Sequence, residues 1–235
     1  MGDHTMDAGS TPTQPPAPIV FILDCDNTLL DNDRVKSDMD AELRRLIGDA
    51  LTERFWQIYE VVRVRESVVD LPMTFLEFRP ELPDDATLER VRSAIMDFPF
   101  ASRLFPATPA TLAYLRSCAL PVIVSDGDSV YQPRKIERSG LAADVNGQWV
   151  VYTHKEDHLE EFMQRWPADF YVMVDDKTRI LAETKRRLPG RFVTVHILQG
   201  HYANSVFDPP PDITLSDIGG LQTLDLASLR AYLRP

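Results

Sequence analysis

Four short apolar runs rich in β-branched residues recur along the chain, and segments with helical spacing separate them. The runs lie at residues 19–23, 121–124, 170–174 and 192–197. Continuous apolar runs of this length are typical of strands that are buried on both faces, as in a parallel sheet. Alternation of such strands with helices predicts an α/β fold with a mainly parallel sheet. Residues 148–152 are expected to add a short further strand.

Helices are expected between these strands from their start and stop signals. One begins at Ser129, with Gln132 as a capping-box partner, and stops at Gly140. Another begins at Thr153, with Glu156 as its partner. Two further helical patterns occupy residues 178–188 and 225–233, and nothing in the second marks an oligomer interface.

The segment between the first two strands follows a different pattern. Its apolar residues fall at helical spacing, as in Leu43, Leu46 and Ile47, and no buried-strand run interrupts them. The sequence therefore predicts a helical insertion over residues 33–103, with core residues 19–32 and 104–235 on either side. Residues 1–18 are rich in proline and small polar residues, and are expected to form a disordered tail.

Charge and composition exclude several classes of protein. Lys and Arg total 25 against 36 for Asp and Glu, which gives a net charge of −11 and disfavours binding to a nucleic acid polymer. Two cysteines cannot build a disulfide framework, so we expect a cytoplasmic, reducing location. No apolar run approaches the roughly 18 residues of a membrane helix.

Paired acids follow the first apolar run. Asp24 and Asp26 stand one residue apart, and Thr28 completes the motif. In open α/β sheets, ligands bind at the carboxyl ends of the strands. Neighbouring carboxylates repel each other unless a cation lies between them or one is protonated. The alternative interpretation is a polar turn whose side chains cap local backbone groups.

Three further polar features follow in order. Ser125, Asp126 and Gly127 come directly after the second run, where a hydroxyl and free backbone N–H groups can hold phosphate oxygens, although the same residues are common in turns. Lys155 falls in the first turn of an expected helix, where a positive charge opposes the helix dipole, and this placement suggests that it neutralises a phosphate or a carboxylate. The alternative interpretation is a solvated surface lysine. Asp175 and Asp176 form a second acidic pair directly after the third run. They either bind a cation or cap the helix that follows. Together these residues could hold one Mg²⁺ and position a phosphoryl group.

This ordered set resembles the signature motifs of the haloacid dehalogenase-like superfamily of phosphotransferases. Asp24-x-Asp26-x-Thr28 resembles the first motif, Ser125 the second and Lys155 the third, with the acidic pair at 175–176 as the fourth. The resemblance covers roughly residues 19–200 apart from the insertion. It implies a doubly wound, Rossmann-like parallel sheet, with residues 33–103 as an inserted α-helical cap.

The resemblance also implies a role for each motif residue. Asp24 would be the nucleophile that forms an aspartyl-phosphate, and Asp26 the general acid and base. Lys155 would balance negative charge. Phosphate oxygens would be held by Thr28, Ser125 and the backbone N–H groups of Asp126 and Gly127. The Mg²⁺ ligands would be Asp24, the backbone carbonyl of Asp26, Asp176 and, directly or through a further group, Asp175.

The expected function is a Mg²⁺-dependent phosphatase that acts on a small phosphorylated metabolite. The dehalogenase branch of the superfamily lacks the second aspartate of the first motif, so Asp26 favours phosphoryl transfer. A phosphomutase of the same fold and a binding or regulatory module without turnover stay open as alternatives. No membrane association is expected.

Other conspicuous residues are expected to be structural. Cys25 should be buried and unreactive beside two acids. Arg63 and Arg65 in the insertion could grip an anionic substrate, but a solvated helix face is the favoured interpretation. The same two interpretations apply to Arg134 and Lys135.

Overall fold

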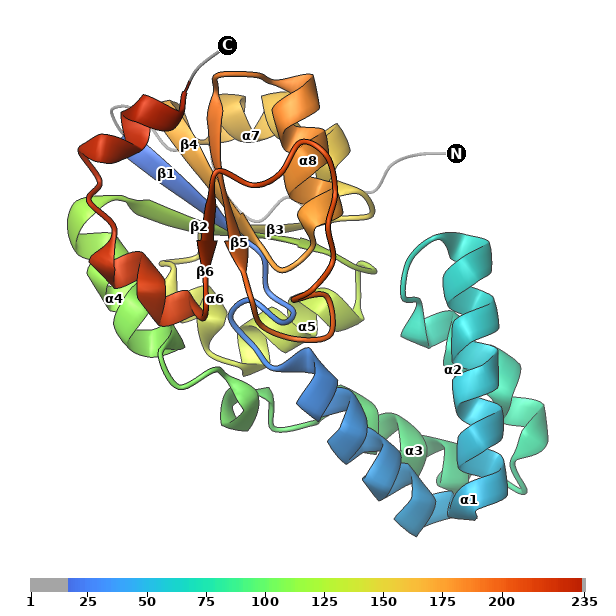
Figure 1. The fold of residues 1–235 in the computed structure, drawn as a ribbon. Helices are drawn as coiled ribbons and strands as arrows, with labels where there is room; N and C mark the ends of the chain where they lie inside the picture. Colours follow the sequence, from blue (N-terminus) through green and yellow to red (C-terminus); the bar gives the residue numbers. More distant parts are fainter. Residues whose placement is uncertain (1–16, 234–235) are drawn as a thin grey trace.

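A parallel sheet of six strands lies at the centre of the chain, in the order β3-β2-β1-β4-β5-β6 (Figure 1). The computed structural model describes residues 17–233, so residues 1–16 of the expected tail lie outside the described residues. Ala17 and Pro18, also expected in the tail, belong to the first strand instead. The strands are β1 (Ala17–Leu23), β2 (Leu120–Asp126), β3 (Trp149–Tyr152), β4 (Ala168–Asp175), β5 (Phe192–Ile197) and β6 (Ile213–Leu215). The strands expected from the four apolar runs and the short extra strand are thereby confirmed, while no strand was expected where β6 lies.

Helices cover both faces of the sheet. One face carries Phe21, Leu23 and Ile123, and the other carries Val20 and Ile22, because successive side chains of a strand point to opposite sides. Burial of both faces explains why these strands are apolar at every position. The covering elements are α4 (Thr108–Cys118), α5 (Tyr131–Arg138), α6 (Leu141–Asp144), α7 (Leu159–Arg165), α8 (Thr178–Arg187), and the 3-10 helices η3 (Lys155–Asp157), η4 (Ile218–Thr223) and η5 (Ser228–Tyr232).

Between β1 and β2 the chain leaves the sheet and forms a separate helical body (Figure 1). It comprises α1 (Asn32–Glu66), α2 (Leu71–Phe78), η1 (Arg79–Glu81), α3 (Asp85–Met96) and η2 (Phe100–Arg103). This body has its own apolar core, which includes Phe55, Phe75 and Phe78. The core also takes in Tyr131 of α5, so the helical body, which we call the cap, packs against the first helix that follows β2.

Three local expectations differ from the structure. The helix expected from Ser129 begins two residues later, at Tyr131, and the Asp128 carboxylate accepts the N–H groups of Val130 and Tyr131 at 2.7 Å in the turn before it. The helix expected from Thr153 is a short 3-10 turn followed by α7. The segment expected as a closing helix at 225–233 contains a 3-10 helix. The helix expected at 178–188 is confirmed as α8.

The strand order decides where the polar motifs meet. β1 lies between β2 and β4, with Leu23 level with Ile123 and Val174. The residues that follow these three strands therefore share one edge of the sheet. The Asp24 N–H donates to the carbonyl of Val174 at 2.9 Å, which places the first acid directly beside the second acidic pair. Within residues 17–233, no helix combines the length and the apolarity needed to cross a membrane.

Candidate active site

The turn after β1 presents Asp24 and Thr28 at the sheet edge and buries Cys25. The N–H groups of Leu29 and Leu30 both donate to the carbonyl of Cys25, at 2.9 and 3.0 Å, which closes a tight turn. Asp24 and Thr28 are both buried. Cys25 packs into the sheet core, and burial together with the neighbouring Asp26 raises the pKa of its thiol well above the usual value. The structural role expected for Cys25 is consistent with this environment.

Lys155 lies between the two acidic motifs and is fully buried. Its Nζ is 2.5 Å from Oδ1 of Asp24 and 2.6 Å from Oδ2 of Asp175, and it also donates to the carbonyl of Val124 at 3.3 Å. Burial by itself would lower the pKa of this ammonium, but Asp175, Asp24 and Asp126 raise it well above the usual value. Lys155 therefore stays charged and offsets part of the negative charge at the strand ends. Because it belongs to a 3-10 turn, the helix-dipole argument for Lys155 does not apply.

Asp24, Asp175 and Asp176 form a buried cluster in which one carboxylate oxygen of each lies within 4.8 Å of the others. Oδ2 of Asp24 and both side-chain oxygens of Asp176 are buried without a hydrogen-bond partner. Burial, together with Asp175 and Asp24, raises the pKa of Asp176 to about 9. Buried oxygens without donors are costly, and a divalent cation with oxygen ligands would satisfy them. The donor set therefore fits Mg²⁺.

A second lysine adjoins this cluster and was not singled out in the sequence. Burial would lower the pKa of Lys177, but Asp24, Asp175 and Asp176 raise it above the usual value. Its backbone N–H donates to Oδ1 of Asp175 at 2.8 Å, which orients that carboxylate. A lysine directly after an acidic pair is the only signal in the sequence, and lysines in that position are common on surfaces.

The second motif orients a hydroxyl toward the same edge. Ser125 Oγ accepts a hydrogen bond from Nε2 of Gln132 at 2.9 Å. Thr28 Oγ1, on the neighbouring strand's turn, is buried without a partner. The Asp126 carboxylate accepts the backbone N–H of Lys155 at 2.8 Å, and burial raises its pKa to about 6.

Gly127 differs from its expected role. Its N–H donates to the carbonyl of Tyr152 at 2.9 Å and is therefore not a free donor for a phosphate oxygen. A side chain at this position would collide with Gln132, whose Cβ lies 2.6 Å from where a Cβ of residue 127 would be. The glycine thus gives Gln132 the space from which it reaches Ser125.

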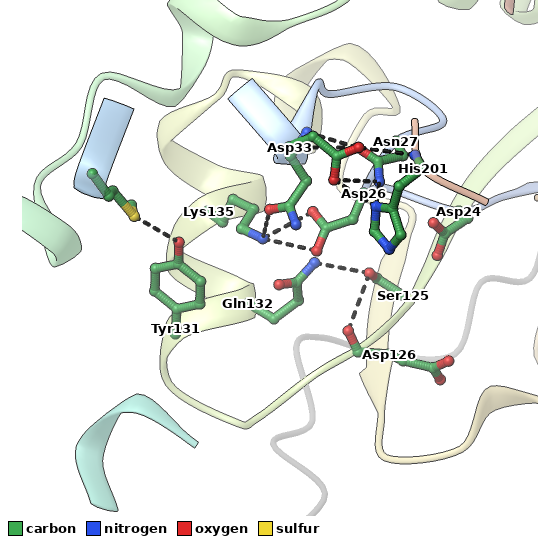
Figure 2. Close-up of polar contacts among 12 residues, drawn as sticks. Asp24, Asp26, Asn27, Asp33, Ser125, Asp126, Tyr131, Gln132, Lys135 and His201 are labelled. Carbon is green, nitrogen blue, oxygen red and sulfur yellow. Dashed lines mark hydrogen bonds and ion pairs between the residues drawn. The ribbon is translucent and has the colours of Figure 1, made fainter. Parts of the chain in front are cut away.

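Lys135 was expected on a solvated face, but only 2% of its side chain is exposed. Its Nζ donates to both carboxylate oxygens of Asp26 at 2.8 Å and to Oδ1 of Asn32 at 3.0 Å (Figure 2). Helix α5 turns this residue toward the sheet edge because Ile136 beside it packs into the core. The solvated-face interpretation does hold for Arg63 and Arg65, which form exposed ion pairs with acids of the cap.

The loop after β5 closes over the first motif. Oδ1 of Asp33 lies 2.7 Å from Nδ1 of His201, and Nδ2 of Asn27 lies 3.4 Å from the same nitrogen (Figure 2). Gln199 donates to the carbonyl of Thr28 at 3.1 Å. Gly200 has φ +69°, and a Cβ there would lie 2.5 Å from Cγ of Asn27, so the close approach of the two loops requires glycine. No local pattern in the sequence indicates these contacts between distant segments.

A pocket opens between the sheet edge and the cap. From the core it is lined by Asp26, Asp126, Gly127, Asp128, Tyr131, Gln132 and Lys135. From α1 and the rest of the cap it is lined by Asn32, Lys36, Met39, Trp56, Tyr59, Val69, Leu71 and Ile95. A small molecule in this pocket would have Asp26 on one side and the cap on the other.

Comparison with known proteins gives similarity at the level of solved structures. No protein-family model and no curated protein matches the chain. A structure described as a haloacid dehalogenase-like hydrolase from Burkholderia xenovorans LB400 is 44% identical, with a TM-score of 0.81, and the match covers 89% of this chain and 100% of that one. A haloacid dehalogenase-like (HAD) hydrolase of Bacillus subtilis, whose structure was solved bound to magnesium, is 12% identical with a TM-score of 0.58. The match covers 89% of this chain and 98% of that one.

A third similar structure is the L-2-haloacid dehalogenase of Xanthobacter autotrophicus. It is 17% identical, with a TM-score of 0.55, and the match covers 88% of this chain and 96% of that one. At such low identity, this structure and the Bacillus structure show a shared fold alone.

Proposed function

Because the chain belongs to the haloacid dehalogenase-like hydrolases, we propose that it is a Mg²⁺-dependent phosphatase that hydrolyses a small phosphate monoester through an aspartyl-phosphate on Asp24. The family membership supports a hydrolase, and the substrate class is our proposal. It is supported by the residues at the ends of β1, β2 and β4.

The observation that carries the proposal is the unsatisfied acid cluster. Oδ2 of Asp24 and both oxygens of Asp176 are buried without donors, and Asp175 adds a third carboxylate within reach of one cation. Displacement of halide from carbon needs a carboxylate nucleophile but no cation. Phosphoryl transfer must bring an anionic phosphate to an anionic nucleophile, so a divalent cation at this position favours it.

Mg²⁺ held by Asp24, Asp175 and Asp176, with the backbone carbonyl of Asp26 as a further proposed ligand, would supply charge stabilisation to the phosphoryl oxygens. Thr28 and Ser125 would hold those oxygens through their hydroxyls. The unpartnered Oγ1 of Thr28 and the Ser125 hydroxyl supported by Gln132 are consistent with this role. Lys155, fixed between Asp24 and Asp175, would offset the remaining charge.

In the first half-reaction a carboxylate oxygen of Asp24 attacks phosphorus, and the bond between phosphorus and the ester oxygen breaks. Asp26, in its protonated form, gives its proton to the leaving oxygen, so an alcohol departs. Asp26 lines the pocket, which supports this role.

In the second half-reaction Asp26 is a carboxylate and takes a proton from a water molecule, whose oxygen attacks the phosphorus of the aspartyl-phosphate. The bond between phosphorus and Asp24 breaks, which releases inorganic phosphate and restores the carboxylate of Asp24. Lys135 holds both oxygens of Asp26 and would position it for this step. The cap side of the pocket would limit the access of other water.

The two free cysteines support a reducing, cytoplasmic setting.

The direct test is release of phosphate from p-nitrophenyl phosphate and a panel of phosphorylated metabolites, with Mg²⁺ and with EDTA. We expect Mg²⁺-dependent hydrolysis that Asp24→Asn lowers by about a thousandfold or more, because the amide is a poor nucleophile. Asp169→Asn is the matched control, because this exposed residue pairs with Arg230 at the surface.

Each other outcome points to a different function. Undiminished activity in Asp24→Asn would rule out the nucleophile assignment. Halide release from a haloalkanoate without phosphate release would indicate a dehalogenase. Transfer of the phosphoryl group within a sugar phosphate would indicate a phosphomutase, and binding without turnover would indicate a regulatory module.

A further inference from the structure

The two ends of the pocket differ in chemistry. The acids that line it, Asp26, Asp126 and Asp128, all come from the strand ends of the core. The cap wall is mainly apolar and aromatic, and its charged member is Lys36 on α1. Asp24 is not among the lining residues, but Asp26 of the same turn is, so a molecule whose phosphoryl group lies at that turn would extend its other end through the pocket toward Lys36.

Lys36 is held against the aromatic wall of the cap. Its Nζ lies 4.8 Å from the ring centroid of Tyr59 and 5.6 Å from that of Trp56. The Trp56 ring is itself fixed, because its Nε1 donates to Oδ1 of Asp40 at 2.9 Å. The ammonium is thus positioned by ring faces, which attract a cation without neutralising it.

Within residues 17–233, no carboxylate forms an ion pair with Lys36. The two acids that act on it most strongly are engaged elsewhere: Glu60 lies 2.7 Å from a guanidinium nitrogen of Arg63, and Asp33 lies 2.7 Å from His201. Lys135, the other lysine of the pocket, is already neutralised by Asp26. Lys36 is therefore the pocket lysine that has no direct ion pair with a described carboxylate.

Burial lowers the pKa of Lys36, because partly removing the charged ammonium from water costs free energy. The contact with two aromatic rings offsets part of that cost. Because Lys36 also lies on the pocket wall, an anion on the bound molecule would meet a partly desolvated cation without an ion-pair partner.

We propose that Lys36 binds a second anionic group of the substrate, so that the preferred substrate is a phosphate monoester with a carboxylate or another phosphate at its far end. This rests on the proposed phosphatase function and narrows its substrate class. The three core acids of the pocket have partners of their own: Asp26 pairs with Lys135, Asp126 accepts the N–H of Lys155, and Oδ1 of Asp128 accepts the N–H groups of Val130 and Tyr131. The second anion would reach the cap wall, away from these acids.

The experiment compares esters that differ only in the far group. The pairs are phosphoglycolate with hydroxyethyl phosphate, phosphoglycerate with glycerol phosphate, and gluconate phosphate with glucitol phosphate. For the pairs that are hydrolysed, we expect the wild-type kcat/KM to favour the acid over the matched alcohol. Lys36→Met should reduce that preference by about tenfold or more, mainly through KM, because a charge-assisted contact contributes this much to binding.

Two further variants separate a binding role from a general charge effect. Arg34→Met removes one positive charge from the exposed side of the same helix, outside the pocket lining, and should preserve the preference. Lys36→Arg keeps the positive charge and should retain most of the preference for the acid. Thermal unfolding of each variant shows whether the fold is intact.

The proposal is overturned if wild-type enzyme does not prefer the acids, or if it hydrolyses p-nitrophenyl phosphate but none of the acids. It also fails if Lys36→Met lowers kcat/KM equally for both members of each pair. It is also overturned if Arg34→Met reduces the preference as much as Lys36→Met does. Hydrolysis of p-nitrophenyl phosphate is the separate check on the proposed function: if no phosphate is released from it or from any ester, the phosphatase itself fails rather than its selectivity.

Discussion

The Nζ of Lys135 lies 2.8 Å from each carboxylate oxygen of Asp26, although 109 positions separate the two residues in the sequence. The lysine is almost fully buried, whereas about a quarter of the Asp26 side chain, 23%, is exposed on the pocket side. This ion pair ties the turn after β1 to helix α5, which also packs against the cap through Tyr131. The orientation of the proposed acid and base thus depends on a helix that follows a different strand.

Lys135→Met should lower kcat by about tenfold to a hundredfold, with a smaller effect on KM, because Asp26 loses its positioning partner. It should also lower the free energy of unfolding by about 1–3 kcal/mol, since a partly buried carboxylate is left unpaired. Steady-state kinetics and urea denaturation measure the two effects. Lys185→Met is the control, because it breaks a 2.5 Å ion pair with Asp212 outside the pocket lining. Equal kcat losses in both variants would contradict the positioning role.

The acid cluster should make the metal-free protein less stable as pH rises. Asp176 has a folded-state pKa of about 9, against an ordinary value of 3.8, so between these values the folded state holds a proton that the unfolded state has lost. Stability is therefore lost as pH rises through this window. In EDTA, Asp176→Asn should make the dependence of Tm on pH shallower. An unchanged slope would show that the cluster does not control it, and Asp169→Asn gives the background slope.

Mg²⁺ should stabilise the wild-type protein by binding the folded state alone. At a concentration about a hundredfold above Kd, the expected gain is about 2.7 kcal/mol in unfolding free energy. Asp176→Asn removes one proposed ligand and should abolish most of the rise in Tm. The same variant should exceed the wild type in Tm at neutral pH in EDTA, because the wild type must take up a proton at Asp176 on folding, at a cost in free energy that asparagine avoids. A Mg²⁺-induced shift that survives in Asp176→Asn would place the cation elsewhere.

Gly200 should be far less tolerant of a side chain than Gly48, although both have positive φ, +69° and +78°. Alanine at Gly48 meets no atom within 4 Å, but with ψ 169° its backbone lies in a region that is essentially open only to glycine and should cost about 1–3 kcal/mol. Alanine at Gly200 meets Asn27 and should cost about 1–3 kcal/mol more. Only this variant should also lower kcat, because Asn27 belongs to the turn that carries Asp24. Similar losses in unfolding free energy for both variants would contradict the clash.

The sequence could predict the features that depend on local pattern. The apolar runs became β1, β2, β4 and β5, because a strand buried on both faces must be apolar throughout. The order of the polar residues after those strands predicted that Asp24, Lys155 and the acids at 175–176 belong to one site. The structure brings these side chains together. Their catalytic and metal-binding roles stay predictions until the kinetic tests are made.

Only the tertiary structure decided which lysines and loops complete the site. The sequence by itself determined the α/β core, the helical insertion and the polar strand ends, because these follow from short-range spacing. It did not distinguish Lys135 from a surface lysine, since its partner Asp26 lies on a different strand's turn. The same holds for Lys36 against Tyr59 and for Gly200 against Asn27. Such contacts arise from the packing of distant segments, and no local pattern records them.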